Sequence, residues 1–124
     1  MIVAIALGGA FGALGRHFLG AGVAALLGHG FPWGTLAANI VGSFVLGVLV
    51  ETMALAWSPS PELRAMLTVG LLGAFTTFSA FSLDAVALYE RDELGLAAAY
   101  VALSVVLSVG GLFVGMRMIR LVLI

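Results

Sequence analysis

Four long apolar segments constrain this chain more than any other feature of its sequence. They cover about residues 2–27, 33–57, 63–89 and 94–119, and each approaches or exceeds the roughly 20 residues that a helix needs to cross a bilayer. Of the 124 residues, 63% are hydrophobic and 9% are charged, and a water-soluble fold of this size cannot bury so much apolar surface. We therefore predict an all-α membrane protein with four transmembrane helices, forming a single domain over residues 1–124.

The middle of the third segment is a poor sequence for a continuous helix. Gly70 and Gly73 are followed by the adjacent β-branched residues Thr76 and Thr77, and both residue types disfavour the helical conformation. Backbone groups freed at membrane depth are tolerated only where protein or a water-filled cavity surrounds them, so a broken helix there is typical of an ion or substrate site. We predict that the third helix is broken near its middle, within residues 70–82.

Neutral polar side chains recur at every fourth position of the second and fourth segments, so each set shares one helical face. The sets are Thr35, Asn39 and Ser43 in the second segment, and Tyr100, Ser104 and Ser108 in the fourth. Such residues often serve only as hydrogen-bond partners between packed helices. Hydroxyl and amide donors also suit an anion, as do the positively polarised ring edges of Phe78 and Phe81 beside the predicted break, whereas a cation path favours rings of Asp or Glu.

The first segment combines small residues with one charge. Gly8 and Gly12 lie on one face, which predicts close packing against another helix. Arg16 costs at least about 3 kcal/mol at membrane depth unless it reaches water or a partner, so we expect it to line a vestibule or the interface. No Lys or Arg precedes this segment, which favours a retained helix over a secretory signal. In the second segment, Glu51 is expected at the helix edge, near lipid headgroups.

Composition excludes several functions. The net charge of −1 argues against a nucleic-acid partner, which requires a basic face. There are no cysteines, so neither disulfides nor thiolate metal sites are expected. His17 and His29 have no catalytic partner at useful spacing, and we do not expect an enzyme.

Positive charges give only a weak instruction for membrane orientation. With four spans, Arg64, Arg117 and Arg120 lie on one side, against Arg91 and, depending on its direction, Arg16 on the other. An excess of positive residues on one side orients membrane proteins, and here the two sides carry nearly equal numbers. Insertion in both orientations, and hence an antiparallel homodimer, is a natural hypothesis.

Three sequence motifs resemble the small bacterial fluoride channels of the Fluc or CrcB family. The first is the glycine-rich run at residues 8–12 leading to Arg16. The second runs from Pro32 through Gly-Thr35-Leu-Ala-Ala-Asn39 to Ser43, and the third is the string Thr-Thr-Phe-Ser-Ala-Phe at residues 76–81. The family often has threonine where this chain has Ala80, but Ala80 points away from the face of the two phenylalanines.

The resemblance implies a multi-pass protein of the bacterial inner (plasma) membrane that exports fluoride passively from the cytoplasm. It implies a dual-topology antiparallel homodimer with two pores, each lined by the two polar stripes and by Phe78 and Phe81, with Arg16 at a vestibule. It also implies a structural sodium ion (Na+) at the dimer interface, held by the backbone carbonyls of Gly73 and Thr76.

Two other hypotheses remain open from the residues alone. A small four-helix proton-coupled multidrug exporter can also insert in both orientations, but it needs a membrane-embedded carboxylate, typically in the first helix. The first segment here contains no Asp or Glu. A membrane assembly protein without transport activity would use the stripes and glycines for packing alone.

Overall fold

The computed structural model describes all 124 residues and contains helices joined by short turns, with no strand. Four spans are long and apolar enough to cross a membrane, which confirms the predicted number. Three are continuous helices: α1 (Ile2–Leu27), α2 (Trp33–Leu55) and α6 (Leu94–Leu123). The third is composite and consists of α3 (Pro61–Ala65), the π-helix η1 (Met66–Leu72), α4 (Gly73–Phe75) and α5 (Phe78–Glu90).

The helix ends differ by a few residues from the predicted ones. The helix α2 ends at Leu55 rather than at residue 57, because Ala56 leaves helical geometry with φ −141°. The third span starts at Pro61 rather than at residue 63, since Ser60 accepts a hydrogen bond from the Leu63 N–H (3.2 Å) and caps the helix. The last helix continues past the predicted residue 119 to Leu123.

The third span is interrupted at Thr76 and Thr77, which confirms a broken third helix. Both residues are extended, with φ and ψ of −87° and 156° for Thr76 and −153° and 127° for Thr77. Gly73, in contrast, is helical with φ −61° and ψ −37°. The glycines before the break therefore belong to helical turns, and the two threonines make the interruption.

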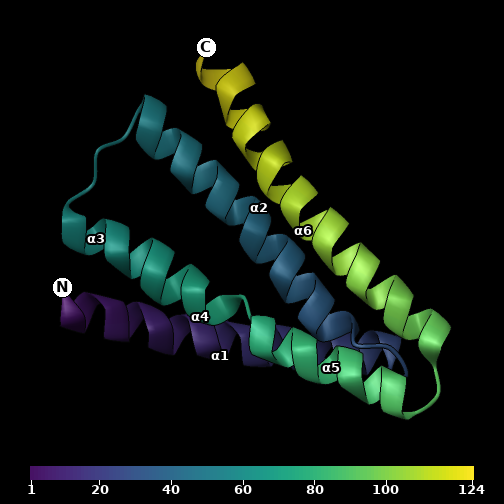
Figure 1. The fold of residues 1–124 in the computed structure, drawn as a ribbon. Coiled ribbons are helices and arrows are strands. Elements are labelled where there is room, and N and C mark those ends of the chain that lie inside the picture. Colours follow the sequence, from purple (N-terminus) through teal and green to yellow (C-terminus); the bar gives the residue numbers. More distant parts are fainter.

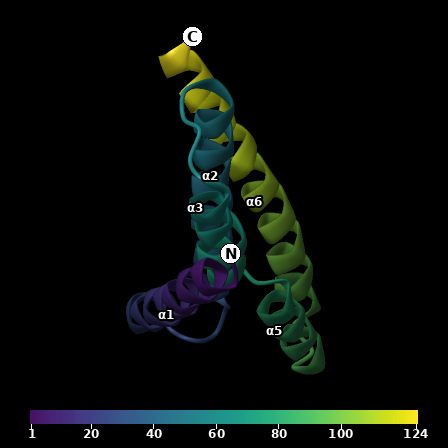
Figure 2. The ribbon, with the colours of Figure 1, turned by 90° about the vertical axis from the view of Figure 1, so that its left-hand side faces the viewer.

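The helices form an open arrangement. The helix α2 packs along α6, while α1 lies against η1 and α4 (Figure 1). The helices α1 and α5 diverge in the view of Figure 2 and do not contact each other. Only 14 of the 124 residues are buried, so most of the apolar surface is left to lipid or to another protein chain.

The predicted packing role of the first-helix glycines is confirmed. A Cβ atom added at Gly8 would meet the carbonyl oxygen of Met66, and one added at Gly12 would meet that of Leu71. Both contacts are with the backbone of η1, which cannot move aside as a flexible side chain can. The two glycines therefore let α1 approach the third span closely.

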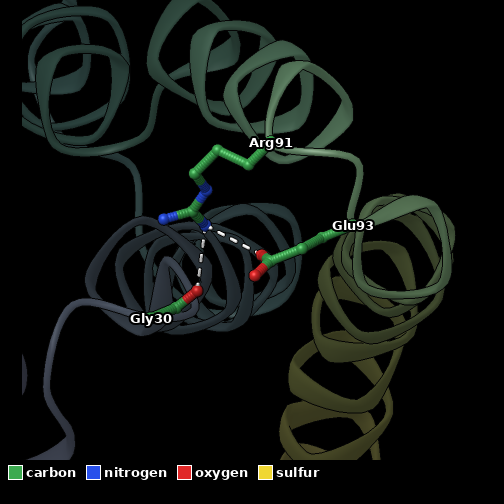
Figure 3. Close-up of polar contacts among 3 residues, drawn as sticks. All are labelled: Gly30, Arg91 and Glu93. Carbon is green, nitrogen blue, oxygen red and sulfur yellow. Dashed lines mark hydrogen bonds and ion pairs between the residues drawn. The ribbon is translucent and has the colours of Figure 1, made fainter.

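Two charged clusters tie helix ends together. Glu51 lies near the end of α2, as expected, but it is buried, at 6% exposed, and its Oε1 accepts a hydrogen bond from Arg120 Nε at 3.2 Å instead of reaching headgroups. At the opposite end of α2, Arg91 donates to the carbonyl of Gly30 (3.1 Å) and to Glu93 Oε2 (3.2 Å), as Figure 3 shows. The second cluster joins the α1–α2 loop to the α5–α6 turn.

Candidate anion site at the helix break

An open hollow of about 250 Å³ lies beside the break in the third span. Residues of α2, the break, α5 and α6 line it, so it lies where three spans meet. Its lining consists of Asn39, Ser43, Thr76, Thr77, Phe78, Phe81, Ser104, Val105, Ser108 and Val109. No charged side chain is among them. The hollow brings together six of the eight residues predicted from the sequence to line an anion path.

Ser104 and Ser108 present hydroxyl groups that no other group satisfies. Both side-chain oxygens are buried, and neither has a hydrogen-bond partner in the chain. A buried polar group without a partner costs about 1–3 kcal/mol, so such groups are rare unless a ligand or water uses them. Since both hydroxyls belong to residues that line the hollow, they are available as donors to an anion there.

The two phenylalanines form one wall of the hollow. Their ring centroids are 5.3 Å apart and their planes are tilted by 55°. The Phe78 residue is 77% exposed, whereas Phe81 packs against Tyr100 with centroids 5.3 Å apart. The edge of an aromatic ring carries partial positive charge, so tilted rings at the side of a polar hollow can face an anion edge-on.

Asn39 is engaged with the backbone of the break. Its Nδ2 donates to the Thr77 carbonyl (3.0 Å), and its Oδ1 accepts from the Thr77 N–H (2.7 Å). An asparagine amide carries two N–H bonds, so one remains for another acceptor. The side chain therefore has a structural partner as well as a place in the hollow.

The remaining predicted pore and vestibule residues lie outside this hollow. Tyr100 is fully buried, and its hydroxyl donates to Asp84 Oδ2 at 3.3 Å. Thr35 and Arg16 line a second hollow of about 480 Å³ together with His17 and His29. Their roles in anion passage stay predictions.

Comparison with known proteins identifies the family. The family model of the CrcB-like protein, Camphor Resistance (CrcB), matches residues 3–116. The chain belongs to the CrcB-like family. A Rhodospirillum centenum protein named fluoride-specific ion channel FluC is 55% identical over 97% of this chain and 95% of its own length. Proteins of the same name from Agrobacterium fabrum and Cereibacter sphaeroides are 50% and 52% identical, each over 96% of this chain and 95% and 94% of their own lengths.

The break of this CrcB-like protein leaves the carbonyl groups of residues 73–76 without their usual helical partners, and those of Gly73 and Thr76 are among them. In a continuous helix the N–H of Thr77 would donate to Gly73 and that of Ala80 to Thr76. Here the Thr77 N–H donates to Asn39, and the Ala80 N–H donates to Thr77 Oγ1 at 3.0 Å. Carbonyl oxygens are suitable ligands for a hard cation such as Na+, so the donor chemistry fits the predicted ion.

From the sequence, Thr77 was predicted to belong to the break but not to the pore, and no role was predicted for Asp84, which lies outside the hollow. Thr77 lines the hollow and caps α5, and its place just before a helical segment was a detectable capping signal. Asp84 accepts the Tyr100 hydrogen bond from within the third span. An acidic residue inside an apolar span is itself a functional signal.

Proposed function

We propose that this CrcB-like protein is a fluoride channel of the bacterial inner membrane, through which fluoride leaves the cytoplasm passively. The names of its close relatives support this proposal, since they are called fluoride-specific ion channels over nearly the whole length shared with this chain. These names describe transport and not catalysis, in agreement with the expectation that the chain is not an enzyme.

The observation that carries the proposal is the pair of unpartnered hydroxyls of Ser104 and Ser108 in an uncharged hollow. Fluoride is small and strongly hydrated, so a pore must replace its water with hydrogen-bond donors before it enters a low-dielectric region. The two serines and the free N–H of Asn39 offer such donors, and the edges of Phe78 and Phe81 add a weak positive field. A fixed cation in this path would retain the anion, and the lining has none.

The second hollow is proposed as a vestibule that leads to this path. It contains Arg16, whose positive charge attracts anions from solution. Thr35 lies there, one turn of α2 before Asn39, and Tyr100 lies one turn of α6 before Ser104. We propose that these two residues extend the polar path towards the vestibule.

We further propose that two antiparallel copies form the functional channel, with one pore on each side. The exposed ring of Phe78 and the small buried fraction of the chain support a second copy over the hollow. The carbonyls of Gly73 and Thr76 from both copies would hold a sodium ion at the interface. When bound, this ion supplies positive charge that links the two broken helices.

Flux from liposomes tests the channel function. Purified protein in liposomes is expected to release fluoride, measured with a fluoride electrode, and to retain chloride, measured with a chloride electrode. Phe78→Ile removes the ring edge and should lower fluoride flux by about tenfold or more. The matched control is Phe113→Ile, since Phe113 is an exposed residue of α6 outside the hollow. Equal release of both anions, or release of neither, would contradict the proposal.

The same assay separates the alternatives. A proton-coupled multidrug exporter would leave fluoride inside the liposomes and would respond to a pH gradient. A non-transporting assembly protein would give no flux under any condition. Neither alternative accounts for unpartnered hydroxyls in a hollow without charged groups.

A further inference from the structure

The side chains of Asn39 and Thr77 stabilise the break in the third span. They do so by binding the N–H groups that would otherwise donate to the carbonyls of Gly73 and Thr76. Oδ1 of Asn39 takes the Thr77 N–H (2.7 Å), which would otherwise donate to the Gly73 carbonyl. Oγ1 of Thr77 takes the Ala80 N–H (3.0 Å), which would otherwise donate to the Thr76 carbonyl. For each of the two carbonyls predicted to bind the cation, one side chain therefore binds the N–H group that would compete with the cation for that carbonyl.

The Asn39 amide forms a pair of hydrogen bonds with the two peptide units on either side of one residue, Thr77. Its Oδ1 and Nδ2 bind the N–H and the C=O of the same residue, Thr77, across 38 positions of sequence. On the next turn of α2, a Cβ atom added at Gly42 would meet the Thr76 side-chain methyl. Since glycine leaves this space free, α2 comes close enough for the Asn39 amide to reach the backbone of the break. The extended conformation of Thr77 is thus fixed from α2.

We propose that Asn39 and Thr77 act as positioning residues for the interfacial cation, because they keep the Gly73 and Thr76 carbonyls free of helical hydrogen bonds. This inference rests on the cation part of the proposed function. Asn39 thereby has a role in cation binding without contacting the ion, in addition to its place beside the anion path. Loss of either side-chain acceptor lets an N–H return to its helical partner, and the cation must then compete with that hydrogen bond.

The expected effect follows from this competition. In Asn39→Leu, which keeps a similar size but has no acceptor, the Thr77 N–H can close on the Gly73 carbonyl. Because each of the two copies must then break one hydrogen bond before the ion binds, the Na+ concentration for half-maximal stabilisation should rise about thirtyfold. Thr77→Val should have a similar effect through Thr76, and Thr77→Ser should restore the wild-type value because it keeps the hydroxyl.

The experiment measures thermal unfolding of the purified full-length protein in detergent while Na+ replaces N-methylglucamine at constant ionic strength. A ligand that binds only the folded protein raises the melting temperature with its concentration. Thr52→Val is the matched control, since Thr52 also lies on α2 but outside the hollow, and its hydroxyl donates only to the Val48 carbonyl of the same helix; its Na+ dependence should equal that of the wild type.

Two results would overturn the inference. One is a wild-type Na+ dependence in folded Asn39→Leu or Thr77→Val. The other is the absence of any Na+ effect in the wild-type protein. Fluoride flux from liposomes reports separately on the channel function: a protein that conducts fluoride but does not respond to Na+ would refute this inference and leave the channel intact. A Na+-responsive protein that conducts no fluoride would do the reverse.

Discussion

At the scale of single residues, the proposed role of Ser104 and Ser108 is in fluoride transport and not in stabilising the fold. Their hydroxyls are buried and have no hydrogen-bond partner in the chain. Replacing either serine with alanine therefore removes no hydrogen bond that stabilises the fold. Ser104→Ala and Ser108→Ala should leave the melting temperature unchanged or slightly higher, while fluoride flux from liposomes falls about tenfold for each donor removed.

The control for this prediction is Ser58→Ala, because Ser58 is exposed in the α2–α3 loop, away from the hollow. It should change neither flux nor melting temperature. If the Ser104 and Ser108 variants instead lost stability and kept their flux, the two hydroxyls would be packing groups and the hollow would not be the path.

Some residues of the site could be predicted from the sequence, and others could not. Spacing of four placed Ser104 and Ser108 on one face of a helix, and the hollow contains both, because helical periodicity is a local property. The pair of hydrogen bonds between Asn39 and Thr77 joins residues 38 positions apart and depends on how two helices pack. No local pattern encodes that contact.

At the scale of helices, the half-buried ion pair between Glu51 and Arg120 joins the ends of α2 and α6. The Glu51 side chain is 7% exposed and that of Arg120 is 45% exposed, so the carboxylate depends on this partner more than the guanidinium does. Arg120→Ala leaves the carboxylate buried without a partner and should lower the free energy of unfolding by about 2 kcal/mol. Denaturant unfolding of the protein in detergent measures this loss.

Two variants control for other causes of that loss. Arg117→Ala removes an exposed arginine that forms no ion pair in the chain, and it should have little effect. Adding Glu51→Gln to Arg120→Ala should recover part of the stability, since a buried neutral amide costs less than a buried charge. Equal losses in Arg117→Ala and Arg120→Ala would show that the ion pair does not stabilise the helix ends.

The number of membrane-spanning helices could be predicted from the sequence more accurately than the position of the break within the third span. The length of each apolar run predicted all four spans, because the thickness of a bilayer sets that length. The position of the break was less predictable: glycine content pointed to residues from Gly70 onward, but Gly73 is helical and only Thr76 and Thr77 are extended. Hydrogen bonds from α2 and from the Thr77 hydroxyl decide this, and they exist only in the folded chain.

At the scale of the whole molecule, one copy leaves its central features uncovered. The helices α1 and α5 diverge (Figure 2), and the Phe78 ring at the hollow is largely exposed. An antiparallel partner would cover this surface and complete the cation ligands, but it requires that the chain insert in both orientations. The small number of arginines and their near-even distribution permit this.

If the channel is an antiparallel dimer, fluoride flux requires copies inserted in both orientations, whereas a channel formed by a single copy does not. Ser58→Lys with Glu62→Lys adds positive charge beside Arg64, while Glu90→Lys with Arg117→Gln shifts the balance towards the opposite side. Each double variant should insert in one orientation, measured by labelling of single cysteines introduced in the loops, and should give little fluoride flux by itself because antiparallel pairs are then scarce. Co-expression of the two should restore flux towards the wild-type level, since each supplies the orientation that the other lacks. Full flux from either variant alone, in a single orientation, would mean that parallel copies or a single copy conduct, and the antiparallel dimer would have to be abandoned.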